Sequence, residues 1–284
     1  MNHLTEKIAL LADSACDLPR DIVEKMAIKI LPLKIIYPEG EFSDRVDIQP
    51  NDVYNRMPGE IPTTAMPCLG EIKSLFETIK SQGFTHVIAV ALSSGLSGTY
   101  GAIKLAAQDI NDMVVKTFDS RTLSMGTGWM VLDAARNITN GLSFDKVMEN
   151  IAHIQPKVKV YYVVETLEYL RKGGRIGQVS AMLGEFLHFK PIISVNPEGK
   201  YFTFCKVRGR RKSIDRLIEI VENIPRDKMI NLAVMHGGAK KEAEHMLERL
   251  SKLPNIKELI FSDISPALGV HTGPGLLGVS FHEV

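Results

Sequence analysis

Short apolar runs alternate with helical patterns along almost the whole chain, and this alternation limits the fold more than any other feature. Strand-like runs lie at 8–12, 30–36, 87–92, 114–118, 158–164, 232–235 and 258–262, and helical patterns at 21–26, 69–81, 102–108, 126–140, 144–155, 213–222 and 240–251. Such alternation is typical of α/β proteins, in which helices cover a mostly parallel sheet. We therefore expect an α/β fold.

The chain has 284 residues, which is enough for two lobes that share a cleft. Around Gln155 and Pro156 it leaves a helical pattern and enters a strand-like run. We expect an N-terminal α/β lobe over residues 1–156, with a mostly parallel sheet. A C-terminal α/β lobe over 157–284 follows, with a ligand cleft between the two. Residues 37–59 predict a hairpin or an excursion on the first lobe.

Charge and cysteine content argue against several classes of function. Lys plus Arg (34) nearly balance Asp plus Glu (33), so we expect no nucleic acid partner and at most a transient membrane contact. Cys16, Cys68 and Cys205 form no CxxC pair and the histidines form no HxH or HExxH, which argues against metal sites and disulfides. The first residues show no secretory pattern and no apolar run spans a bilayer, so we expect a cytoplasmic protein.

One loop combines hydroxyls, glycines and a helix start. The segment Ser93-Ser94-Gly95-Leu96-Ser97-Gly98-Thr99-Tyr100 follows a buried run and opens a helical pattern. At such a place, unpaired amides and the positive end of the helix dipole attract a small anion, and glycines let the backbone approach it. Because the loop has no lysine, histidine or carboxylate, it is suited to hold a negative group rather than to react with it. The alternative is that Ser94 caps the helix and the glycines make a turn.

Two other segments offer polar side chains. Thr63 and Thr64 stand between prolines in a stiff segment that suits an inward hydroxyl, although a threonine cap is the alternative. His271 precedes a Gly-Pro-Gly turn whose GxGxxG match fails as a nucleotide motif, because only six residues follow Gly278. We expect a rigid loop that aims His271 at a ligand, although a lone histidine is usually a surface or core residue.

An enzyme remains the alternative to a binding protein. Gly95-Leu96-Ser97 begins like a nucleophile elbow, but the next glycine falls at 98, so the GxSxG spacing fails. The sequence places no base beside Ser97; the candidates are His86, His188 and His271. A phosphotransferase or hydrolase that uses His271 or Ser97 directly therefore stays open.

Two basic segments and one apolar segment are further candidates for binding surfaces. Arg171–Arg175 and Lys206–Lys212 are either solvated edges or binding sites for an acidic partner or a phosphorylated group. Residues 180–193, with Leu123, Met125 and Trp129, are apolar and mostly core. A cleft lined by some of these residues would suit an amphiphile with an acidic head and a long tail.

Segments 11–19, 63–67, 93–100, 119–126, 170–177, 190–193 and 271–275 together resemble the DegV family, in order and spacing, over almost the whole chain. The resemblance implies a two-lobed fold that buries a long-chain fatty acid between its lobes. It implies a carrier that presents the carboxylate to a separate ATP-dependent fatty acid kinase subunit, which forms acyl phosphate for phospholipid synthesis. It also implies that this chain has no complete active site and no cofactor beyond the bound fatty acid.

Carried over residue by residue, the resemblance puts the head-group hydroxyls at Thr64 and Ser94, with His271 beside them. The carboxylate is expected against these hydroxyls and the amides of Gly95 and Leu96. The full predicted ligand set is Thr63, Thr64, Ser93, Ser94, Gly95, Leu96 and His271. The family more often has Thr-Ser-Gln-Pro-Ser where this chain has Thr64-Ala65-Met66-Pro67-Cys68, so this wall is more apolar here. The expected kinase-docking residues are Arg171, Arg175, Arg208, Arg210 and Arg211.

Overall fold

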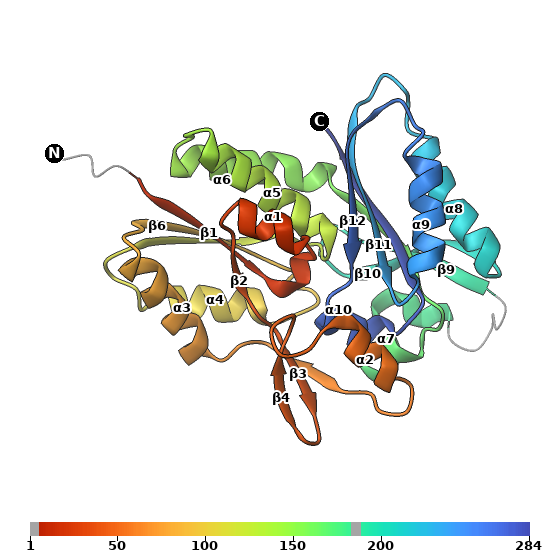
Figure 1. Cartoon of the computed structure of the whole chain (residues 1–284), viewed down its shortest axis with the longest axis horizontal. Coiled ribbons are helices and arrows are strands. Elements are labelled where there is room, and N and C mark those ends of the chain that lie inside the picture. Colours follow the sequence, from red (N-terminus) through yellow and green to blue (C-terminus); the bar gives the residue numbers. More distant parts are fainter. Residues whose placement is uncertain (1–5, 183–188) are drawn as a thin grey trace.

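The computed structural model describes residues 6–182 and 189–284, and it contains two main sheets (Figure 1). The first is a four-stranded parallel sheet of order β2-β1-β6-β7. Its strands are β1 (Ile8–Asp13), β2 (Lys29–Leu31), β6 (His86–Ala91) and β7 (Val114–Asp119). The predicted α/β fold with a parallel sheet in the first lobe is confirmed.

Helices cover both faces of this sheet, which explains why its strands are continuously apolar. Leu11 and Ala89 pack toward α3 (Leu69–Ser81) and α4 (Thr99–Ala107). Their strand neighbours Leu10 and Ile88 point to the opposite face, which is covered by α5 (Met125–Thr139) and α6 (Phe144–Ile154). The short helix α1 (Arg20–Lys25) follows β1.

The second sheet has six strands in the order β10-β9-β8-β13-β11-β12. They are β8 (Lys159–Val163), β9 (Phe189–Val195), β10 (Tyr201–Arg208), β11 (Ile230–Gly237), β12 (Ile256–Asp263) and β13 (Leu276–Glu283). β11 and β12 run parallel, and the other pairings are antiparallel. Helices α8 (Arg210–Glu222) and α9 (Lys240–Leu250) pack on this sheet.

Helix α5 joins the two sheets. It contacts β1 and β6 of the first sheet and β8 and β13 of the second. Its Trp129 is 1% exposed and donates from Nε1 to the carbonyl of Ser280 at 3.3 Å. One apolar core therefore runs from Leu10 to Met235 across both lobes. The chain passes between the lobes through the 3-10 turn Gln155–Lys157, and the division at residue 156 stays a prediction.

A small three-stranded sheet projects at the lower edge of Figure 1. It contains β3 (Lys34–Tyr37), β4 (Gly40–Ser43) and β5 (Thr63–Ala65), with α2 (Pro50–Arg56) between β4 and β5. The predicted excursion over 37–59 is confirmed as the β3–β4 hairpin and α2. Two further short helices, α7 (Glu168–Lys172) and α10 (Pro266–Thr272), pack against each other, and α10 also contacts α2 and β5.

Two local predictions are wrong. The run at 30–36 is two strands of different sheets, β2 and β3, because Pro32 lies between them and lacks the N–H that a continuous strand needs. His271 belongs to α10 and not to a loop, since Pro266 starts a helix that ends only at Gly273. Within residues 6–182 and 189–284, no helix has the length and apolar character that a membrane crossing requires.

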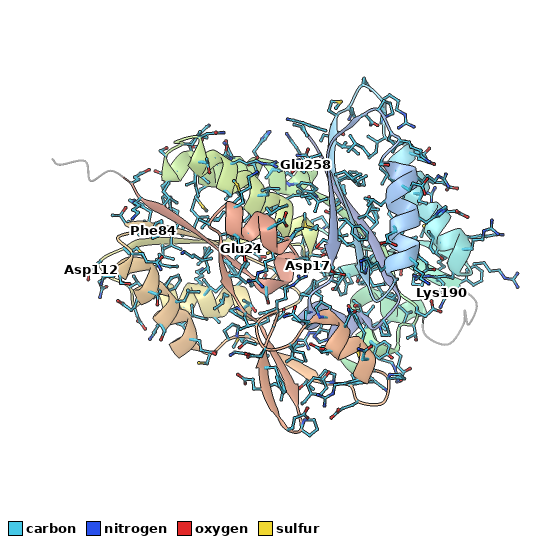
Figure 2. All side chains as sticks on the ribbon, viewed as in Figure 1. Asp17, Glu24, Phe84, Asp112, Lys190 and Glu258 are labelled. Carbon is cyan, nitrogen blue, oxygen red and sulfur yellow. The ribbon has the colours of Figure 1, made fainter. Side chains whose placement is uncertain are left out.

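A buried carboxylate connects the two lobes. Asp17 is 1% exposed and lies between α1 and the second sheet (Figure 2). Its carboxylate accepts hydrogen bonds from Ser124 Oγ at 2.6 Å and from the Ser265 amide at 2.8 Å, and its carbonyl accepts one from Ser262 Oγ. Burial raises the pKa of Asp17, while Arg45 and these donors act in the opposite direction.

Arg45 completes the group of residues that connects the lobes. We call this group the lobe joint; it contains Asp17, Arg45, Ser124, Ser262 and Ser265. Its Nη2 lies 3.4 Å from Asp17 Oδ1 and donates to the carbonyl of Asp263 at 2.5 Å. Asp17, Arg45 and Ser124 all have positive φ, at 52°, 61° and 51°. Such backbone costs of order 1–3 kcal/mol per residue. The hydrogen bonds of the joint therefore hold three residues in conformations that they would otherwise avoid.

Replacing Asp17 is expected to destabilise the whole chain. Asp17→Ala leaves Ser124 Oγ and the Ser265 amide without their carboxylate acceptor and removes the negative charge beside Arg45, which keeps only its bond to the carbonyl of Asp263. We expect the free energy of unfolding to fall by about 3 kcal/mol in urea denaturation. Asp17→Asn keeps one acceptor oxygen and is expected to lose less. The control is Asp145→Ala, whose side chain is 79% exposed and pairs with Lys116; it should change stability by about 0.5 kcal/mol or less. Equal losses for the two alanine variants would contradict the role of the joint.

Candidate ligand-binding site

A cavity of about 410 Å³ lies where β5, the loop after β6, the turn after α7 and helix α10 meet. Its lining residues are Leu33, Thr64, Ala65, Met66, Leu92, Leu96, Ser97, Gly98, Arg175, Tyr201, Leu268 and His271. Aliphatic side chains and Met66 form much of the wall, and a few polar groups converge on one part of it. This is the usual composition of a small-molecule site.

Thr64 and His271 come together in this cavity. Thr64 Oγ1 and His271 Nε2 are 2.8 Å apart, although the residues are 207 positions apart in sequence. Gly173 makes room for the ring, because a Cβ there would lie 2.1 Å from His271 Nδ1. Burial, and then the positive charge of Arg175, lower the pKa of His271 to about 4. The imidazole is therefore neutral at physiological pH.

A neutral imidazole carries one proton, and its position decides what Thr64 can do. Nδ1 is buried without a hydrogen-bond partner among the described residues. Unpaired buried N–H groups are rarer in proteins than unpaired acceptors. We therefore assign the proton to Nε2, which donates to Thr64 Oγ1. The Thr64 hydroxyl hydrogen is then free for an acceptor in the cavity.

Arg175 brings a positive charge into the cavity wall. Its Nε donates to the carbonyl of Leu96 at 3.3 Å and its Nη1 to the carbonyl of Gly173 at 2.7 Å. The first bond ties the turn after α7 to the Ser/Gly loop of the other lobe, and the second holds the side chain against its own turn. The sequence predicts Arg175 as a kinase-docking residue, whereas the structure places it beside His271. The sequence does not distinguish Arg175 from its basic neighbours Arg171 and Lys172, so it does not predict that Arg175 lines the cavity.

The first part of the Ser/Gly loop packs against protein rather than facing the cavity. Ser93 is fully buried and donates to the carbonyl of Gly199 at 2.7 Å. A Cβ on Gly95 would lie 2.8 Å from the carbonyl oxygens of Glu198 and Gly199. The glycine thus permits close approach of the β9–β10 turn. The Gly95 amide donates to Ser93 Oγ, and the Leu96 amide to the carbonyl of Ser93.

Ser94 is exposed and bonds to a carboxylate. Its Oγ donates to Asp119 Oδ2 at 2.5 Å and its amide to Oδ1 at 3.1 Å. The helix-cap alternative is wrong, because α4 begins after Gly98. Of the loop, Leu96, Ser97 and Gly98 line the cavity. Ser97 Oγ shares a hydrogen bond with Thr99, and no hydrogen bond joins Ser97 to His271 among the residues described.

The remaining predicted residues fall in several places. Thr63 is exposed, because successive residues of β5 point to opposite sides and Thr64 faces the cavity. Arg171, Arg208 and Arg211 are exposed, whereas Arg210 pairs with Glu242 at 2.7 Å. In the part of the chain that the structure covers, no three His, Cys, Asp or Glu side chains are placed to hold a metal ion.

The predicted apolar lining is only partly visible. Residues 183–188, including His188, lie outside the described residues. Leu123, Met125 and Trp129 are buried in the core. Leu123 also lines a second apolar space of about 20 Å³, together with Ser124, Val160, Tyr162, Met235, Ile264, Leu268, Thr272 and Leu276. Leu268 lines both spaces, so the apolar surface leads from the polar end of the larger cavity toward the core.

The chain is similar to known proteins over nearly its full length. A family model described as "Uncharacterised protein, DegV family" matches residues 7–284. A DegV domain-containing protein of Clostridium acetobutylicum is 46% identical over 274 residues, which cover 96% of this chain and 98% of that protein.

Solved structures share the fold. DegV of Bacillus subtilis, described as a fatty acid binding protein, superposes with a TM-score of 0.91 at 29% identity and covers 98% of this chain and 100% of its own. A stearic acid-binding protein of Eubacterium ventriosum has a TM-score of 0.87 at 26% identity and covers 98% of both chains. The DegV-type fold expected from the sequence is thereby confirmed.

Gly173→Ala is expected to displace His271. The backbone at this position, with φ −76° and ψ −4°, accepts alanine, but the added Cβ overlaps the ring. We expect the ring to move away from Thr64, with a stability loss of about 1–3 kcal/mol. Imidazole NMR signals of His271 should shift, while in the parent protein they stay at neutral-form values from pH 5 to pH 8, as follows from a pKa of about 4. Gly101→Ala has open space around its Cβ and should leave these signals unchanged. Titration of His271 near pH 6.5 in the parent protein would contradict the assignment.

Proposed function

The chain belongs to the DegV family, and from this premise we propose that it binds a long-chain fatty acid with the carboxylate at Thr64 and Arg175 and the acyl chain along the apolar wall. The observation that carries the proposal is the pairing of Thr64 with a neutral His271 at the polar end of an otherwise apolar cavity. The descriptions of the structural relatives as binders of fatty acid and of stearic acid support it.

The head-group interaction rests on two donors. The Thr64 hydroxyl, released by the Nε2–H tautomer of His271, donates to one carboxylate oxygen. Arg175 supplies the opposite charge, and its Nη2 has no hydrogen bond to a described residue. A charge-assisted hydrogen bond of this kind contributes roughly 1.5–3 kcal/mol. Ser97 and Gly98 close the polar end of the cavity. Ser93, Ser94 and Gly95 do not contact the ligand in this proposal; they hold the loop in place through the β9–β10 turn and Asp119.

The acyl chain supplies most of the affinity. Burial contributes roughly 0.8 kcal/mol per methylene, so a long chain outweighs the head group. Its path leads along the apolar wall of the larger cavity to Leu268, which also belongs to the core shared by both lobes. The head group therefore sets the orientation of the ligand, and the tail sets its retention.

We further propose that the protein is a carrier and performs no chemistry itself. A separate ATP-dependent fatty acid kinase subunit transfers the phosphoryl group to the carboxylate, and the acyl phosphate then enters phospholipid synthesis. The dependence on ATP points to the cytoplasm. Arg171, Arg208 and Arg211, which are exposed, are the docking residues in this proposal. Arg210 positions the start of α8 through Glu242.

Extraction of the purified, denatured protein is expected to release a fatty acid that mass spectrometry identifies. Added stearate should raise the melting temperature of delipidated protein, because a ligand that binds only the native state stabilises it. Thr64→Val keeps the shape of the side chain but removes its hydroxyl, so stearate affinity should fall about tenfold. Thr63→Val in the same strand faces away and should retain full affinity. Empty preparations without a stearate-induced shift would overturn the proposal, and a phosphoryl adduct formed with ATP alone would overturn the carrier role.

Charge reversal on the docking face is expected to separate transfer from binding. Arg208→Glu with Arg211→Glu should slow acyl phosphate formation by the purified kinase subunit with ATP at least tenfold, because complementary charge governs encounter. Stearate affinity should be unchanged. The control double variant, Lys25→Glu with Lys104→Glu, makes the same charge change at exposed positions elsewhere. Equal slowing by both double variants would show a general charge effect instead of a docking face.

A further inference from the structure

A separate cavity of about 270 Å³ lies where the turn between β7 and α5 in the first lobe meets β8 and the end of β9 in the second. Its lining residues are Ser120, Arg121, Thr122, Gln155, Pro156, Val158, Lys159, Val160, Ser194, Val195, Asn196 and Pro197. None of them lines the cavity that contains Thr64 and His271. A ligand at this place is therefore independent of fatty acid binding.

Two cationic residues line this cavity, and no acidic residue does. Arg121 is exposed, and only its backbone amide, not its guanidinium, bonds to another described residue. Lys159 is also exposed and uses its ammonium group on one backbone carbonyl at 3.0 Å, which leaves further N–H donors. Of the acids nearby in sequence, Asp119 accepts from the hydroxyl and amide of Ser94, and Glu198 is exposed outside the lining. The cavity therefore offers two positive charges that a ligand can reach from solvent.

The backbone at Arg121 has a conformation that arginine rarely adopts. Its φ of 50° lies in the left-handed region, which costs of order 1–3 kcal/mol for a residue other than glycine. Asp119 Oδ1 stabilises this turn by accepting from the Arg121 amide at 3.0 Å. Gly199 packs against the same turn, because a Cβ there would lie 3.2 Å from Arg121 Cα. Strained backbone of this kind is concentrated at ligand sites, and here it lies in the cavity wall.

The rest of the wall is apolar or already hydrogen-bonded. Ser194 Oγ donates to the carbonyl of Val160 at 2.7 Å, and Ser120 Oγ donates to the carbonyl of Thr122 at 3.1 Å. Apolar surface comes from Pro156, Val158, Val160, Val195 and Pro197. The volume is slightly below the roughly 300–1,000 Å³ of usual small-molecule sites. A ligand that fits is therefore compact, with an anionic group for the two cations and a small body for the apolar surface.

We propose that this cavity binds a compact phosphate monoester with a small, partly apolar body. Such a group carries roughly 1.5–2 negative charges at pH 7, which matches the two cations. The planar guanidinium of Arg121 pairs with two phosphate oxygens at once, and the ammonium of Lys159 acts as a point charge on the third. A monocarboxylate would neutralise only one of the two cations. Because Arg121 follows β7 and Lys159 begins β8, the bound ligand connects the two lobes.

The test compares three probes on the whole protein by NMR titration: phenyl phosphate, benzoate and succinate. We expect saturable binding of phenyl phosphate, with methyl shifts at Val158 and Val195 and an affinity about tenfold or more above that of the other two probes. The shifts should be the same in stearate-loaded and delipidated protein. Benzoate or succinate binding as tightly as phenyl phosphate would overturn the assignment to a phosphate monoester. Shifts at Leu96 and Leu268 instead, or no saturable shift, would overturn the site itself.

Matched variants test the two cations directly. Arg121→Gln and Lys159→Gln should each lower phenyl phosphate affinity about tenfold, because each removes one charge-assisted contact. The control is Lys157→Gln, which makes the same charge change two residues from Lys159; Lys157 is exposed, lies outside the lining and contacts His153 at 2.7 Å. It should retain the affinity. Equal losses in Lys157→Gln and Lys159→Gln would show a general charge effect, and retained affinity in Arg121→Gln would contradict the assigned contact.

Discussion

The placement of the two lobes depends on one buried carboxylate. Asp17 follows the first strand, yet its partners come from three other parts of the chain: Ser124, Arg45 and the start of α10 at Ser265. A carboxylate removed from water is stable only when its oxygens are satisfied, so these segments must assemble around it together. The apolar core that runs between the sheets is non-directional and permits many relative orientations. The directional bonds at Asp17 select one of them, and with it the walls of the cavity.

The Ser/Gly loop has two parts with different roles: its first residues fix it to the second lobe, and its later residues line the cavity. Gly95 lacks a Cβ so that the backbone at Glu198 and Gly199 approaches it, and Ser93 bonds to that same turn. These residues fix the loop to the second lobe from behind. The following residues, Leu96 to Gly98, then face the cavity. The local pattern of hydroxyls and glycines resembles an anion-binding loop, but the hydroxyls of Ser93, Ser94, Ser97 and Thr99 all form hydrogen bonds with protein atoms.

The sequence predicts the elements that local rules determine. The parallel strands are visible because burial on both faces makes them continuously apolar, and the helix at 69–81 has the predicted bounds. Helices α7 and α10, with five and seven residues, are too short to show a helical period. Strand β13 is not predicted, because Gly278 interrupts its apolar pattern. A glycine is needed there, since a Cβ would lie 3.0 Å from Met235 Cε and 3.1 Å from Tyr162 Cβ. Thr64 and His271 are recognisable as polar residues in stiff segments. The position of Arg175 beside His271 cannot be predicted from the sequence, because it depends on how the lobes pack.

Helix α10 begins at the lobe joint and ends at the cavity. The amide of Ser265, just before its first turn, bonds to Asp17, and His271 in its last turn bonds to Thr64. Its seven residues span only about 10 Å, too short a distance to bend appreciably. The position of His271 in the cavity is therefore fixed by the bond that Ser265 makes at the joint. A substitution that disturbs the joint at Asp17 would therefore also displace Thr64 and His271, although neither residue bonds to Asp17.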